Sequence, residues 1–138
     1  MMRVAIVGCG FVADYYVRTL PVHPALELVG VMDRDAERAE RFARYYSLSR
    51  YESLDELLAD PRVEIVLNLT NPSSHYEVSK RALLAGKCVY SEKPMAMHFA
   101  EAKELVELAE NRRLQISSAP CSLLGETAQT MWKALREE

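Results

Sequence analysis

The sequence has few cysteines, and their spacing excludes the usual cysteine-based sites. Its three cysteines, Cys9, Cys88 and Cys121, are far apart, and no C-x-x-C pair occurs. A zinc site needs clustered Cys and His ligands, whereas a disulfide-stapled domain needs an even number of cysteines at short spacings. We therefore expect no metal site, and reduced thiols that are typical of a cytoplasmic protein.

The sequence also lacks a strong charge of either sign and a long hydrophobic run. The formal net charge is −3, which gives no electrostatic reason to expect nucleic acid or an anionic membrane as partner. The apolar run near the N-terminus breaks at Gly8, so it is too short for a membrane span or a signal peptide. Repeats, linkers and low-complexity segments are absent, and the length suits one domain.

What the sequence does have is an alternation of two kinds of segment. Nearly continuous β-branched runs are typical of strands covered on both faces, and amphipathic stretches are typical of helices. The expected strands span 3–8, 26–33, 63–70, 88–92 and 114–119, and the expected helices 35–46, 53–60, 75–86 and 99–110. This alternation predicts right-handed βαβ crossovers, and so an α/β fold with a doubly wound parallel sheet in three αβα layers.

Local residues mark the ends of several of these helices. Ser53 and Glu56 have the spacing of a capping box, and Gly86 suits a left-handed helix end. We assign residues 1–120 to the sheet domain and residues 121–138 to a C-terminal helix. Trp132 in that helix is expected to pack against a neighbour rather than to bind a ligand.

The first chemical motif is the G-x-G-x-x-A stretch at 8–13, between an expected strand and an expected helix. Gly8 allows the tight turn, Gly10 lets a pyrophosphate approach the backbone, and Ala13 lets the helix pack closely on the sheet. The helix N-terminus offers free N–H groups to the phosphates. The alternative is a glycine-rich turn that binds nothing. The residues assigned to the cofactor from this turn are Gly8, Gly10, Phe11 and Val12.

An acidic residue stands where a dinucleotide site needs one. Asp33 ends the second expected strand 23 residues after Gly10, and a carboxylate there accepts hydrogen bonds from the adenine ribose. Because this carboxylate would repel a 2′-phosphate, it favours NAD. Arg34 leaves NADP open, since its guanidinium could stack on adenine, pair with a 2′-phosphate, or simply be solvated.

Two more polar stretches follow expected strands, and the carboxyl ends of parallel strands share one edge of the sheet. The first gives Thr70, Asn71, Pro72 and His75 to the site. Ser73 or Ser74 is expected to cap the helix that aims His75 at the cofactor, although a plain turn with a surface histidine is the alternative. The second stretch gives Glu92 and Lys93, followed by Pro94, whose peptide bond is expected to be trans.

Taken in order, the stretches GCGFVA, Asp33-Arg34, TNPSSH and SEKPM resemble the N-terminal half of the Gfo/Idh/MocA oxidoreductases over residues 2 to 120. The resemblance implies a Rossmann-type fold that binds NAD, with NADP as the other option. It also implies that Lys93 reaches the substrate hydroxyl beside the nicotinamide, where a proton must move as hydride leaves. Glu92 is then near the nicotinamide ribose, and Thr70, Asn71, Pro72 and His75 line the nicotinamide end.

Two departures from the family pattern matter. His98 stands where relatives commonly have a threonine or serine cap, so the start of the following helix is less certain. Relatives are about twice as long, and their second domain holds an open β-sheet, the substrate pocket and an acid/base histidine. None of the three histidines here, His23, His75 and His98, matches that residue.

The resulting expectation is an NAD(P)-dependent oxidoreductase domain. The full enzyme would act on a secondary alcohol or ketone of a sugar, inositol or nucleotide sugar, without nucleic acid or membrane partners. Exposed apolar surface left by the absent domain would favour self-association into homo-oligomers. The alternative is a binding module that holds a dinucleotide without catalysis. Methyl transfer from S-adenosylmethionine is the third reading, but it gives Glu92-Lys93-Pro94 no role.

Overall fold

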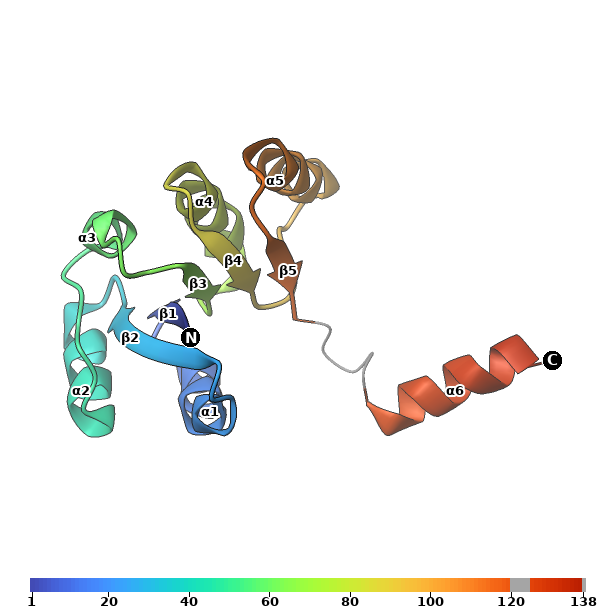
Figure 1. The fold of residues 1–138 in the computed structure, drawn as a ribbon, viewed down its shortest axis with the longest axis horizontal. Helices are drawn as coiled ribbons and strands as arrows, with labels where there is room; N and C mark the ends of the chain where they lie inside the picture. The colour runs from blue at the N-terminus through green and yellow to red at the C-terminus, as the bar shows by residue number, and fades with distance from the viewer. Residues whose placement is uncertain (120–124, 138) are drawn as a thin grey trace.

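The computed structural model describes residues 1–119 and 125–137. Its strands form one parallel sheet of five, in the order β2-β1-β3-β4-β5 (Figure 1). The strands are β1 (Met2–Val7), β2 (Leu26–Met32), β3 (Ile65–Asn68), β4 (Cys88–Ser91) and β5 (Ile116–Ser118). The predicted α/β class is confirmed, and the strands lie within or close to their predicted ranges.

Helices cover both faces of the sheet. They are α1 (Phe11–Thr19), α2 (Ala36–Tyr46), α3 (Leu54–Ala59), α4 (Pro72–Leu84), α5 (Phe99–Arg112) and α6 (Glu126–Glu137), with a 3₁₀ turn at Leu20–Val22. Figure 1 shows α1 and α2 on one face and α3, α4 and α5 on the other, with α6 apart from the sheet. The three αβα layers are therefore the ones that the sequence predicts.

Each face of the sheet has its own apolar core, because successive strand residues point to opposite faces. Val4 and Ile6 pack with the α1 and α2 side, whereas Ala5 and Val7 pack with the other helices. The largest side chains with no exposed surface include Ile6, Leu57, Leu83 and Leu105. Burying a side chain of this size stabilises the fold by about 1.5–3 kcal/mol.

The strands end in one row, which places their following turns along a single edge. Val7 pairs with Met32 on one side and with Asn68 on the other, and Asn68 pairs in turn with Ser91. The glycine turn follows Val7 directly, and Glu92 follows Ser91. All the motifs predicted to share this edge therefore do so.

The structure corrects the predicted start of α4. The helix begins at Pro72, and its N-cap is Asn71 rather than a serine. Ser73 and Ser74 lie in the first turn, where both hydroxyls donate to Asn71 Oδ1 at 2.8 and 3.0 Å. Proline suits this first position because its fixed φ is helical and no hydrogen bond is needed from its nitrogen.

Other helix ends agree with the sequence. Ser53 accepts a hydrogen bond from the Glu56 N–H at 3.1 Å, and Gly86 has φ +78° just after α4. The reciprocal half of the predicted capping box differs, because the Glu56 carboxylate accepts from the Glu52 N–H at 2.6 Å rather than from that of Ser53. At α5 the helix does begin at Phe99, and the Glu101 carboxylate accepts from the His98 N–H at 3.3 Å. The acidic side chain thus supports this start in place of a serine or threonine cap.

Helix α6 is amphipathic, and its large apolar side chains Met131, Trp132 and Leu135 are exposed. Trp132 is 54% exposed, and its ring is contacted by the Arg136 guanidinium 4.2 Å from the ring centroid. Pro120, Cys121 and the first part of the helix expected over 121–138 lie outside the described residues. Within the described ranges, every helix is too short or too polar to cross a membrane.

Candidate dinucleotide-binding site

A groove of about 440 Å³ opens at the carboxyl edge of the sheet, between the glycine turn and the turn after β3. The strand order reverses there, because β2 lies on one side of β1 and β3 on the other. Doubly wound sheets bind their ligands at such a switch point. The predicted site residues that line the groove are Gly8, Gly10, Phe11, Val12, Asp33, Arg34, Thr70 and Asn71.

The two glycines of the turn have different structural roles. Gly8 has φ +99°, and a Cβ added there would lie 2.7 Å from the carbonyl carbon of Leu69, so the turn packs directly on the backbone after β3. A Cβ added to Gly10 would meet no atom of the described residues within 4 Å. Gly10 is also the N-cap of α1 and provides no side-chain cap. The open space over Gly10 and the uncapped helix end fit a phosphate group.

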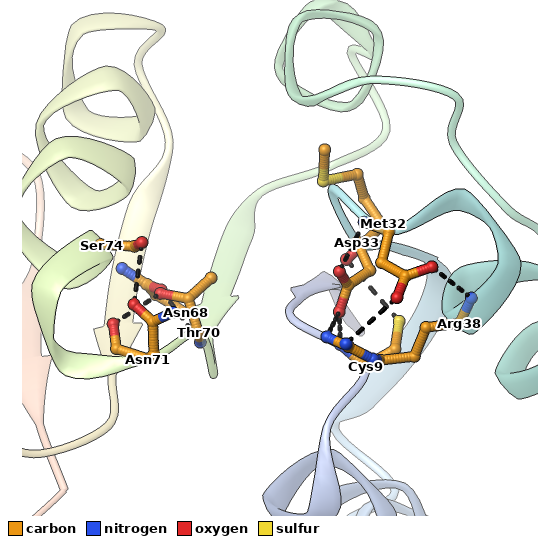
Figure 2. Close-up of polar contacts among 9 residues, drawn as sticks. Cys9, Met32, Asp33, Arg38, Asn68, Thr70, Asn71 and Ser74 are labelled. Atoms are coloured by element: carbon orange, nitrogen blue, oxygen red, sulfur yellow. Dashed lines mark hydrogen bonds and ion pairs between the residues drawn. The ribbon is translucent and has the colours of Figure 1, made fainter.

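Asp33 ties the end of β2 to the glycine turn. One carboxylate oxygen accepts from the Cys9 N–H at 2.9 Å, and the other accepts from the Asp35 N–H at 2.9 Å. The Arg38 guanidinium lies 3.4 Å away, and the side chain of Asp33 is only 6% exposed (Figure 2). Asp33 is therefore held rigidly at the predicted place, with part of its hydrogen-bonding capacity already used.

Three arginines line the groove, of which the sequence predicted only Arg34. Arg34 is exposed and has no hydrogen bond or ion pair to any residue in the described ranges. Arg38 pairs with Asp33 and Asp35, and Arg81 of α4 pairs with Asp55. The i, i+3 spacing from Asp35 could have indicated Arg38. Arg81 has no comparable local signal, because its partner precedes it by 26 residues.

The opposite wall of the groove rests on a buried polar network that centres on Asn68. Its side-chain nitrogen donates to the His75 carbonyl at 2.9 Å and to Ser79 Oγ at 3.0 Å. Its side-chain oxygen accepts from Thr70 Oγ1 at 2.7 Å (Figure 2). Asn68, His75 and Ser79 have no exposed surface. The sequence signal for this network is one amide within an otherwise apolar strand, and it was missed.

The His75 ring lies below this rim rather than in the groove. Its Nε2 is 2.9 Å from the Thr70 carbonyl oxygen, and its Nδ1 is 2.6 Å from the Pro94 carbonyl oxygen. His75 is fully buried, so it is not the surface residue of the plain-turn alternative. The ring contacts the backbone of both polar turns and does not line the groove.

Glu92 and Lys93 follow β4 on the same edge, beyond the lining of the groove. Glu92 accepts from the Tyr16 hydroxyl at 2.9 Å with one oxygen and from the Lys93 N–H at 3.1 Å with the other. Lys93 is exposed, and its ammonium has no partner in the described part of the chain. Tyr16 was not predicted, because it comes from α1, 76 residues before Glu92.

The Lys93–Pro94 peptide bond is cis, which corrects the expectation of a trans bond. Before proline the two isomers differ by only about 0.5–1 kcal/mol, so the frequency of trans bonds does not decide an individual case.

Two groups near the groove are held in their protonated forms. Burial, with Asp33 nearby, raises the pKa of the Cys9 thiol to about 12, so this cysteine is not a nucleophile at neutral pH. Burial and the hydrogen bond to Glu92 raise the pKa of Tyr16 well above its usual value, so its hydroxyl remains a donor. Residues 1–119 and 125–137 contain no group of three His, Cys, Asp or Glu side chains placed to hold a metal.

Comparison with known proteins also indicates a dinucleotide-binding domain. The family model described as an oxidoreductase family with an NAD-binding Rossmann fold, Gfo/Idh/MocA, matches residues 2–119. The trans-1,2-dihydrobenzene-1,2-diol dehydrogenase of Mus musculus is 35% identical over 121 residues, which are 86% of this chain and 36% of the mouse protein.

Solved structures agree in fold over nearly the whole chain. A biliverdin reductase from Synechocystis sp. PCC 6803, in complex with biliverdin and NADP⁺, is 28% identical with a TM-score of 0.89, covering 97% of this chain and 42% of that one. A 3-ketoreductase from Actinomadura kijaniata, in complex with NADP and TDP-benzene, is also 28% identical with a TM-score of 0.89, covering 99% of this chain and 42% of that one.

The chain spans about a third of the length of the curated relatives it first matches. The matched part runs from β1 to β5 and includes the groove, Asp33 and the Glu92-Lys93-Pro94 turn. The protein belongs to the Gfo/Idh/MocA family of oxidoreductases, of which it contains the NAD-binding Rossmann domain.

Proposed function

We propose that this chain supplies the dinucleotide-binding part of an enzyme that transfers hydride between a nicotinamide and a secondary alcohol or ketone. The substrate class is a sugar, an inositol or a nucleotide sugar. The observation that carries the proposal is the common edge: the glycine turn follows β1 and Lys93 lies after β4, on either side of β3, and Tyr16 of α1 is hydrogen-bonded to Glu92. The A. kijaniata relative, a ketoreductase with NADP and TDP-benzene, supports this class.

Each end of the site has its own task in this proposal. The uncapped N-terminus of α1 and the space over Gly10 bind the pyrophosphate, and Asp33 and Arg34 lie at the adenosine end. Thr70, Asn71 and Pro72 border the nicotinamide end, which brings the bound ring toward Lys93. When bound, the nicotinamide supplies the hydride chemistry. The Lys93 Nζ exchanges a proton with the substrate oxygen, and it is free to do so because no ion pair within the described residues holds it.

Cofactor titration of this chain tests the first half of the proposal. NADH or NADPH fluorescence should change saturably, and a chain that binds neither would contradict the proposed function. For the second half, Lys93→Ala in the complete enzyme should lower kcat strongly and leave cofactor affinity nearly unchanged. The loss is on the order of 10²–10⁴-fold, the usual contribution of a positioned acid or base. An unchanged kcat would contradict the role of Lys93.

A binding module without catalysis is the second candidate. The residues that line the groove all lie between Val7 and Arg81, and this chain spans about a third of the relatives' length. This observation favours binding that does not depend on the rest of those proteins. Assays of polyol-dependent NADH formation separate the two candidates. If the chain by itself binds the cofactor but turns over no polyol, the result supports a binding module without catalysis.

A further inference from the structure

We infer that His75 is a positioning residue that connects the turn after β3 to the turn after β4 and so fixes the position of Lys93. The inference rests on the proposed function for the importance of Lys93, but its geometric part stands on the ring contacts alone. Nε2 of His75 faces the Thr70 carbonyl at 2.9 Å, and Nδ1 faces the Pro94 carbonyl at 2.6 Å. One imidazole thus connects the turn after β3 to the turn after β4.

The His75 ring does more than fill apolar space, because its nitrogens face two backbone carbonyl groups. A neutral imidazole has one N–H and an imidazolium has two, so one or both of the carbonyl groups receive a hydrogen bond from the ring. His75 has no exposed surface, and a backbone carbonyl buried without a donor costs about 1–3 kcal/mol. Removal of the ring nitrogens therefore leaves at least one rim carbonyl without its donor.

The contact made by Nε2 belongs to an already rigid wall. Thr70 is also held by Asn68, whose side-chain nitrogen bonds to Ser79 Oγ. The Pro94 carbonyl has no comparable partner network in the described ranges, and it directly follows Lys93 in the chain. His75 consequently transmits the position of the rigid β3 turn to the turn that carries Lys93.

Buried Ser79 offers a matched control. It lies one helical turn after His75 on α4, has no exposed surface, and bonds to the same Asn68 network. Within the described residues its side chain has no hydrogen bond to the turn after β4, so Ser79→Ala removes a buried hydrogen bond and leaves the contact between His75 and Pro94 in place. A general loosening of α4 would affect both variants alike.

Hydrogen exchange on the ligand-free chain tests the inference directly. The Glu92 N–H donates to the Asn68 carbonyl, and the Lys93 N–H donates to the Glu92 carboxylate, so both amides report on this turn. His75→Phe should speed exchange of these two amides by about five- to tenfold, as expected for the loss of one hydrogen bond. Ser79→Ala should leave them at the wild-type rate. Equal effects of the two variants, or none from His75→Phe, would overturn the inference.

Two conservative variants test the two ring nitrogens separately. They also provide a test if His75→Phe does not fold. An asparagine places its amide nitrogen near the position of Nδ1, and a glutamine places it near that of Nε2. His75→Asn should therefore keep the protection of the Glu92 and Lys93 amides, while His75→Gln should lose it. The opposite ranking would overturn the inference.

Titration of the variants with NADPH and with ADP-ribose tests whether the position of the Lys93 turn affects cofactor binding. His75→Gln should weaken binding of NADPH about five- to tenfold and leave ADP-ribose, which lacks the nicotinamide, within about twofold. Equal weakening of both ligands would argue against the positioning role. If the wild-type chain bound neither ligand, the proposed function would fail, and the exchange rates would still decide the role of His75.

Discussion

The hydroxyl of Tyr16 donates a hydrogen bond to the Glu92 carboxylate at 2.9 Å. This bond connects α1, which begins at the glycine turn, to the turn that carries Lys93. The Tyr16 ring also lies edge-on to that of Tyr90 in β4, with 6.2 Å between the centroids. The helix that would bind the phosphates is thereby fixed against the strand that presents the amine.

Replacement of Tyr16 by phenylalanine should release the Glu92 carboxylate while keeping the ring contact. We expect the free energy of unfolding to fall by about 1 kcal/mol, the net value of a typical hydrogen bond. NADPH affinity should fall more than ADP-ribose affinity, because only the nicotinamide end loses a fixed neighbour. Tyr15→Phe, on the exposed side of the same helix, is the control and should change neither quantity. Equal results for the two variants would contradict the role of this bond.

Substitutions of Gly8 and Gly10 should affect stability and cofactor binding separately. Gly8→Ala should destabilise the chain by at least about 1–3 kcal/mol, because its φ of +99° is strained for any other residue and the Leu69 backbone occupies the space. Gly10→Ala should leave the free energy of unfolding within about 1 kcal/mol, because no atom in the described part of the chain contacts the added methyl group. It should nevertheless weaken NADH and NADPH binding. Urea unfolding and fluorescence titration measure the two effects, and unimpaired binding by Gly10→Ala would contradict the phosphate site.

Arg34 should decide how well a 2′-phosphate is accepted. Its guanidinium is exposed at the groove and unpaired within the described residues, whereas the Asp33 carboxylate is already bonded to Cys9, Asp35 and Arg38. We expect Arg34→Ala to weaken NADPH binding about tenfold or more and NADH binding little, since a charge-assisted hydrogen bond contributes about 1.5–3 kcal/mol. Arg41→Ala, an exposed arginine on α2, serves as the control. Equal losses for both cofactors would assign Arg34 to adenine stacking instead.

Acid should destabilise the chain partly through Asp60, which lies away from the groove. Arg62 and Tyr51 hydrogen-bond its carboxylate and hold its pKa well below the usual value. A carboxyl group with a lowered pKa in the folded state stabilises above its unfolded pKa of about 3.9, and this contribution is lost as the pH falls below that value. Asp60→Asn should therefore be less stable at neutral pH and less sensitive to acid. Urea unfolding between pH 7 and pH 3 measures this, and parallel curves for both proteins would contradict the assignment.

The predictable parts of the site are those whose signal is local. The glycine turn, Asp33 and the Glu92-Lys93-Pro94 turn all adjoin strand ends, so strand patterning was enough to place them on one edge. The contacts that join these parts are long-range: Tyr16 to Glu92, His75 to Pro94 and Arg81 to Asp55 connect residues 76, 19 and 26 positions apart. Such contacts depend on how helices pack, and periodicity does not specify that.

The position of the nicotinamide of a bound dinucleotide tests the proposed function most directly. Amide chemical shifts of the isotope-labelled chain should be followed during titration with NADPH and, separately, with ADP-ribose. We expect both ligands to shift the amide signals of Gly10 and Asp33, and only NADPH to shift those of Thr70 and Lys93 as well. Shifts confined to the amino edge of the sheet, or a Lys93 amide that responds to neither ligand, would contradict the proposed function.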